Sequence, residues 1–107
     1  MKLSRLVTSI FLMSFTFGFF AYAADEVLVA EGETLFTTKE GLGVKIACTT
    51  CHKGDKAVKL AEVNAAGDQL PDVINKYVVE KSKGSALAKD SREMQALTAY
   101  IKEKHAV

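Results

Sequence analysis

Two cysteines and a histidine stand close together near the middle of the chain, in the run Cys48-x-x-Cys51-His52. The sequence has no further cysteine, and its one other histidine is His105. A thiol pair at this spacing beside an imidazole serves one of three chemistries: a redox dithiol, a zinc site or the covalent attachment of haem. These three differ in what the rest of the chain must supply.

The dithiol and zinc interpretations each ask for features that the surroundings do not offer. A redox dithiol is typical of a strand-turn-helix context, and no neighbouring segment has the alternation of a strand. A zinc site takes four ligands, so it would need both cysteines and both histidines. His52 directly follows Cys51, whereas zinc ligands are usually separated by two or more residues. Both interpretations stay as alternatives.

Attachment of one haem uses each residue of the run once. Cys48 and Cys51 lie about one helical turn apart, so both sulfurs can reach the vinyl groups on one porphyrin edge, and His52 then faces the iron. We therefore expect haem c, with its iron, as the cofactor. Cys48 and Cys51 would form the thioethers, and His52 would be the proximal axial ligand.

The sixth position of that iron has two protein candidates. Met94 is the one methionine after residue 23, and a thioether paired with histidine raises the reduction potential. Met94 also shares a helical face with Leu97 and Ile101, so simple packing is the competing interpretation. His105 is the alternative ligand, and is otherwise expected to be a surface residue near a frayed end. A third alternative is an open or labile site that admits CO, NO or O2.

The first residues of the chain have the pattern of an export signal. A positive start precedes an uncharged, largely apolar run at residues 6–20, and Ala-Tyr-Ala ends at residue 23. This pattern predicts a signal peptide over residues 1–23 and a periplasmic protein. The run is shorter than the about 20 residues that a spanning helix needs, so we expect no membrane span after cleavage.

The expected mature chain, residues 24–107, is small and almost neutral. It has 84 residues; the signal carries two of the 14 basic residues, so 12 basic residues face 13 acidic ones, a net charge of −1. This charge argues against a nucleic-acid partner, which calls for a basic patch. One Phe, two Tyr and no Trp remain to build a core. A haem would supply the missing apolar body in so small a domain.

The first helix is expected over residues 25–38. Leu28, Gly32, Leu35 and Phe36 fall on one helical face of this segment. A glycine in mid-helix costs about 1 kcal/mol relative to alanine. We therefore expect another helix to cross closely at Gly32.

The rest of the chain also follows a helical pattern. Pro71 suits the first turn of a helix from residue 70 to about 81, which Asp68 or Gln69 can cap. The last helix opens at Asp90 or Ser91, where Asp90 begins an acceptor-x-x-Glu capping box. Loops are predicted at residues 39–47 and 82–89 and a short helix within 57–66, and no segment has a strand pattern. The fold class is therefore all-α.

Three segments together resemble the class I cytochrome c family. Gly32-x-x-x-Phe36 is similar to the small and aromatic pair of the family's N-terminal helix, and residues 48–52 match its attachment motif. Residues 97–101 are similar to the C-terminal helix that crosses the first one at that glycine. The resemblance implies a bundle of three to four helices wrapped around one covalently bound haem, as a monohaem cytochrome c domain over residues 24–107.

The chain departs from this family in two places. The family has a Gly-Pro-x-Leu segment after the attachment motif, and its carbonyl orients the axial histidine. Pro71 is the one proline here, so another carbonyl must orient His52. The family's second ligand is a methionine in the loop before the last helix, and residues 82–89 contain none.

The resemblance implies an electron carrier that moves single electrons between periplasmic redox proteins. No acid–base pair or nucleophile is evident, so we do not expect an enzyme. The alternatives are a haem protein that binds or senses a small ligand and a small haem subunit of a larger periplasmic oxidoreductase. The lysines near the motif and the 82–89 loop are expected to form a solvated face, because the mature chain is almost neutral.

Overall fold

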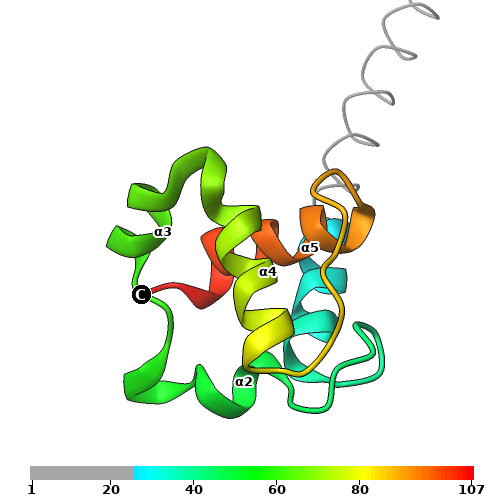
Figure 1. Cartoon of the computed structure of the whole chain (residues 1–107). Helices are drawn as coiled ribbons and strands as arrows, with labels where there is room; N and C mark the ends of the chain where they lie inside the picture. The colour runs from blue at the N-terminus through cyan, green and yellow to red at the C-terminus, as the bar shows by residue number, and fades with distance from the viewer. Residues whose placement is uncertain (1–25) are drawn as a thin grey trace, which may run out of the picture.

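Helices and the loops that join them make up the described part of the protein. The computed structural model describes residues 26–107, and the predicted signal peptide at residues 1–23 lies outside that part. No strand occurs in residues 26–107, so the all-α prediction is confirmed there (Figure 1). The helical elements are the N-terminal helix (described over residues 26–37), α2 (Cys48–Cys51), η1 (Gly54–Lys56), α3 (Leu60–Ala66), η2 (Gly67–Gln69), α4 (Leu70–Glu80), α5 (Arg92–Tyr100) and the π-helical turn η3 (Ile101–His105).

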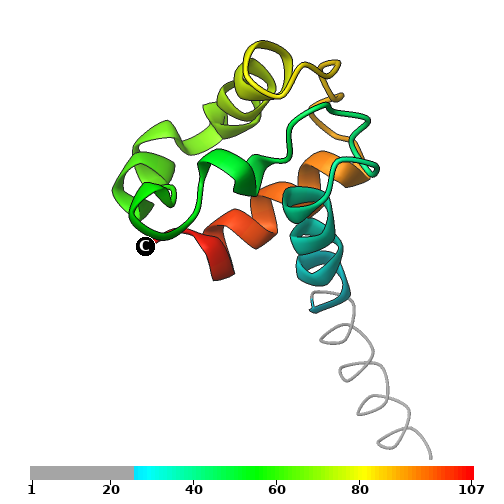
Figure 2. The ribbon, with the colours of Figure 1, turned by 90° about the horizontal axis from the view of Figure 1, so that it is seen from below.

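The N-terminal helix and α5 cross in close contact at Gly32, as predicted. A Cβ added to Gly32 would collide with the carbonyl group of Ala96 and would lie 2.7 Å from the Cβ of Tyr100. The two helices lie side by side in both ribbon views (Figures 1 and 2). Beside the crossing, Phe36 and Tyr100 have ring centroids 5.4 Å apart. A glycine is needed here because any side chain would separate the two backbones.

The start of α5 lies at one of the two predicted residues, whereas the start of α4 has no side-chain cap. Ser91 caps α5, because its hydroxyl accepts a hydrogen bond from the Met94 amide at 3.2 Å. The residue three positions after this cap is Met94, so the capping box predicted from Asp90 does not form. Gln69 precedes α4 without a side-chain cap, because its backbone is already helical at the end of η2 and continues directly into α4.

One hydrophobic core joins the elements. Its least exposed large side chains are Met94, Leu97 and Val78, which lie on α5 and α4. Phe36 adds the N-terminal helix to this core, and Val63 adds α3. The apolar faces predicted for the first and last helices therefore do point inward, through Phe36 on the first and Met94, Leu97 and Ile101 on the last.

The linker between α4 and α5 has no helix, as predicted, and is held by specific hydrogen bonds. The side chain of Asn75 donates to the carbonyl of Leu87 and accepts from its amide, both at 2.8 Å. The carbonyl of Ser82 accepts from the amides of Lys45 and Ile46 at 2.8 and 3.3 Å. These bonds tie the two predicted loops to each other and to α4.

The last residues of the chain return to the segment that follows the Cys-x-x-Cys-His run (Figure 1). The Val107 amide donates to the carbonyl of Val58 at 3.1 Å, and the Leu60 amide donates to the carbonyl of Val107 at 2.9 Å. The short helix predicted within residues 57–66 begins only at Leu60, because the preceding residues take part in this pairing. The expectation that His105 sits near a frayed end is therefore wrong.

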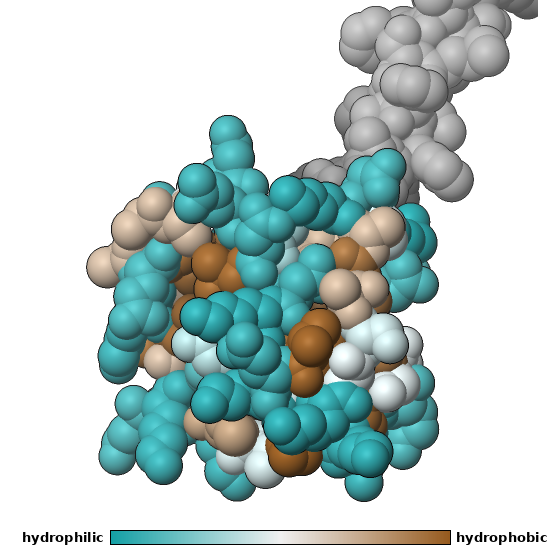
Figure 3. Space-filling model, in the orientation of Figure 1, coloured by the Kyte–Doolittle hydropathy of each residue, from teal (hydrophilic) through white to brown (hydrophobic). Residues whose placement is uncertain are grey.

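The face seen in Figure 3 is mainly hydrophilic, with hydrophobic side chains visible in the hollows between the polar ones. Among residues 26–107, no helix combines the length and the apolar character needed to cross a membrane.

Candidate cofactor site

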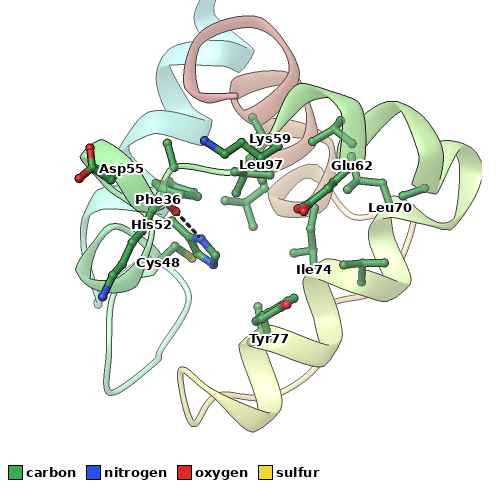
Figure 4. A pocket seen from close by; sticks show the side chains of 18 residues that line it. Phe36, Cys48, His52, Asp55, Lys59, Glu62, Leu70, Ile74, Tyr77 and Leu97 are labelled. Atoms are coloured by element: carbon green, nitrogen blue, oxygen red, sulfur yellow. Dashed lines mark hydrogen bonds between the residues drawn. The ribbon is translucent and has the colours of Figure 1, made fainter. Parts of the chain in front are cut away.

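An apolar cavity of about 400 Å³ lies between α2, α3 and α4, with α5 and the N-terminal helix behind it (Figure 4). Pockets for small molecules and cofactors typically measure about 300–1,000 Å³ and are mostly apolar. Eighteen residues line the cavity between α2, α3 and α4, and they are Phe36, Cys48, His52, Asp55, Lys56, Ala57, Val58, Lys59, Glu62, Val63, Ala66, Leu70, Val73, Ile74, Tyr77, Val78, Leu97 and Ile101.

The predicted attachment residues lie at one wall of this cavity. Cys48 and Cys51 are the first and last residues of α2, a single helical turn, and both thiols are free. Cys48 is half-buried and lines the cavity, while Cys51 is exposed and is not among the lining residues. His52 ends the turn, and its imidazole points into the cavity (Figure 4). The structure thus brings Cys48 and His52 to the cavity, with Cys51 on the same turn.

The imidazole of His52 is oriented by a backbone carbonyl. Its Nδ1 lies 3.2 Å from the carbonyl oxygen of Lys56 (Figure 4). A carbonyl oxygen only accepts, so Nδ1 carries the proton and donates it, which leaves the lone pair on Nε2 free for a metal. The carbonyl that contacts the His52 ring is therefore that of Lys56, four residues further along the chain.

Cys48 has the wrong properties for a reactive dithiol. Burial raises the pKa of its thiol, and the neighbouring Cys51 adds to the rise. A redox-active cysteine needs a lowered pKa, since the thiolate is the nucleophile. For zinc, no three His, Cys, Asp or Glu side chains gather to hold a metal ion in the part of the chain that the structure describes. The raised pKa of Cys48 thus does not favour a reactive dithiol, and the arrangement of the described side chains does not favour a zinc site.

Neither predicted sixth ligand lines the cavity. Met94 is 1 % exposed and belongs to the hydrophobic core. His105 packs against Phe36, with ring centroids 4.4 Å apart, and its Nε2 accepts a hydrogen bond from the Val58 amide at 3.1 Å. Burial lowers the pKa of His105, and the nearby His52 lowers it further, so its neutral form is favoured.

The wall across the cavity from His52 comes from α4. Leu70, Ile74 and Tyr77 project from this helix toward the cavity (Figure 4). The Tyr77 ring meets the His52 ring edge-on, with centroids 5.8 Å apart. Among the described residues that line the cavity, this wall offers neither sulfur nor imidazole opposite His52.

Sequence reasoning missed several features of this site. Tyr77 lies in the helix predicted from residue 70 to about 81, and an aromatic residue with a hydroxyl in that helix is a signal that could have marked it as part of the site. The Lys56 carbonyl leaves no trace in the sequence, because every residue has a backbone carbonyl. Glu62 of α3 lines the cavity but belongs to a segment without a clear pattern.

The residues present fit a covalently held haem. Two thiols lie on one helical turn, an imidazole with a free Nε2 points into the cavity, and the remaining walls are mainly apolar. A scan against protein-family models and searches of curated proteins and of solved structures find no match to this chain.

Proposed function

We propose that this chain is a periplasmic monohaem c-type cytochrome that carries single electrons. Cys48 and Cys51 would hold haem c through thioethers, and His52 would bind its iron through Nε2. The observation that carries the proposal is the hydrogen bond from His52 Nδ1 to the Lys56 carbonyl at the wall of an apolar cavity. A histidine that binds a metal usually donates its other ring N–H in this way.

The chain's own residues would set the properties of the site. When bound, haem supplies an iron that changes its oxidation state by one electron. Leu70, Ile74 and Leu97 keep the cavity apolar, and low polarity around a redox centre influences its potential. In this proposal the domain is the cytochrome bundle that the sequence resembles, and the signal peptide at residues 1–23 is removed on export.

The charges around the cavity favour no strongly charged partner. Lys56 and Lys59 line it together with Asp55 and Glu62, so positive and negative groups are mixed. A one-sign patch would be needed to steer an acidic or a basic partner over a distance. The proposed redox partners are therefore expected to dock mainly through uncharged contacts near the cavity.

The test is the state of the haem in the exported, processed protein. Co-expression with a haem-ligation system should give a coloured chain whose pigment resists extraction into acidified organic solvent. Cys48→Ser and Cys51→Ser should each remove one thioether and shift the alkaline pyridine spectrum of the haem, while Thr49→Ser, between them, should change nothing. A colourless wild-type protein, or a pigment that extracts fully, contradicts the proposal.

A second candidate function is binding of a small ligand such as CO, NO or O2 at the sixth position. The placement of Met94 and His105 outside the cavity lining favours it, together with the apolar α4 wall opposite His52. The spectrum of the reduced holoprotein separates the two. A low-spin spectrum that does not change when CO is added supports electron transport. If the Met94→Leu variant no longer gives that low-spin spectrum, Met94 is the sixth ligand. A high-spin spectrum that shifts under CO supports ligand binding.

A further inference from the structure

Two of the last three residues of the chain, His105 and Val107, are hydrogen-bonded to the segment that immediately follows η1. The Val58 amide donates to Nε2 of His105 at 3.1 Å, and the Val58 carbonyl accepts from the Val107 amide at 3.1 Å. The Leu60 amide donates to the carbonyl of Val107 at 2.9 Å. Both backbone groups of Val58 are therefore held by residues about 50 positions further along the chain.

This pairing lies two residues from the carbonyl that orients His52. Lys56 ends η1, where its amide donates to the carbonyl of Lys53 at 3.0 Å. The peptide unit that carries the Lys56 carbonyl is held directly by the Ala57 amide, which donates to the carbonyl of Gly54 at 3.1 Å. The anchored Val58 is a second hold, on the C-terminal side of that peptide unit, and releasing Val58 would remove it.

His105 does not line the cavity itself, but it contacts two residues that do. Its ring packs against Phe36, and its Nε2 holds Val58; both of these residues line the cavity, and His105 does not. We infer that His105 is a positioning residue for His52: by accepting the Val58 amide proton it holds the Lys56 carbonyl where that carbonyl accepts from His52 Nδ1. The inference rests on the proposed function for its effect on the iron.

The chemical effect follows from the basicity of the ligand. A hydrogen bond from Nδ1–H of His52 to a carbonyl makes Nε2 a stronger electron-pair donor to the iron, which favours the ferric over the ferrous state. Loss of the acceptor on His105 would weaken the hydrogen bond between His52 Nδ1 and the Lys56 carbonyl, and the reduction potential would rise. A side chain that only fills space beside Phe36 would not have this effect.

Two substitutions separate these roles of His105. His105→Phe keeps an aromatic ring beside Phe36 but cannot accept from Val58. His105→Gln loses the ring but retains an oxygen that can accept. The reduction potential of His105→Phe should rise above that of the wild type, while His105→Gln and the neighbouring control Lys104→Arg should stay close to it. Equal potentials in all four proteins, or a larger shift in His105→Gln than in His105→Phe, overturn the inference.

A spectroscopic measurement keeps the test independent of the variants' folding and of the haem. In the ¹⁵N-labelled wild type, a coupling across the hydrogen bond should join the Val58 amide to Nε2 of His105, and its absence overturns the inference. If the wild-type holoprotein gives a low-spin spectrum and both His105→Phe and His105→Gln lose it, His105 is itself an iron ligand and the inference is wrong. A colourless wild type refutes the proposed function instead. The His52 ring shifts then decide the inference: Nδ1–H should persist in the wild type and in His105→Gln and be lost in His105→Phe, and any other pattern overturns it.

Discussion

Replacing Gly32 with alanine places a methyl group where the N-terminal helix and α5 are closest. Two of the three atoms nearest to that methyl group belong to the Ala96 carbonyl group, and the third is the Cβ of Tyr100 at 2.7 Å. None of the three is the end of a flexible side chain. The helices themselves must therefore move apart, and the contact between Phe36 and Tyr100 moves with them.

The size of the effect follows from two opposing contributions. Overpacking a well-packed site costs about 1–3 kcal/mol, and the rigid backbone at Ala96 puts Gly32→Ala at the upper end. Alanine gains about 1 kcal/mol over glycine inside a helix. The expected net loss in the free energy of unfolding is about 2 kcal/mol. For a domain of this size that loss lowers Tm by about 8–16 °C.

The assay is denaturant unfolding of the mature protein followed by circular dichroism, with Gly41→Ala as the matched control. The closest contact of a Cβ on Gly41 is the Cδ2 atom of Leu35, at 2.6 Å, which is the end of a side chain that can move aside. Gly41→Ala should therefore stay within about 1 kcal/mol of the wild type. If both variants unfold at the same denaturant concentration, the close crossing does not limit stability and the reasoning is refuted.

Three further predictions concern bonds at the surface and in the linker. Asn75→Ala removes both hydrogen bonds to the Leu87 backbone and should lower the free energy of unfolding by about 2 kcal/mol in urea; Asn75→Asp, which keeps the acceptor, should lose less. Ser91→Ala removes the α5 cap and should cost about 1 kcal/mol in the same assay. The Arg92 guanidinium lowers the pKa of Glu31, so Arg92→Gln should return that pKa toward 4.5 in an NMR titration. Because the folded pKa is lowered, this pair stabilises the fold above the unfolded pKa of Glu31, and the difference between variant and wild type should vanish as the pH falls through the folded pKa.

The features that depend on local spacing could be predicted from the sequence. The one-turn separation of Cys48 and Cys51, the close crossing at Gly32 and the apolar faces of the first and last helices all follow from a period of 3.6 residues. The end of α4 at Glu80 lies within one residue of the prediction. These features need no knowledge of where distant segments meet.

The features that depend on distant segments could not be predicted. α3 starts at Leu60 because the preceding residues pair with the chain's last ones, and this pairing leaves no local pattern. Met94 has the right chemistry for a ligand, but only the tertiary arrangement shows that it lies in the core and not at the cavity. The sequence left the cap of α5 open between Asp90 and Ser91, since both are good acceptors and differ by one residue in register, and the structure places it at Ser91.

The pairing of residues 58–60 with residue 107 also has a consequence for the order of events during synthesis. A chain grows from its N-terminal end, so both thiols emerge more than 50 residues before the partner of Val58 exists. Closing so long a loop is slow compared with forming a helical turn. The nascent chain therefore passes through an interval in which Cys48 and Cys51 have emerged but the pairing of residues 58–60 with residue 107 cannot yet form, and the arrival of the final residues ends that interval.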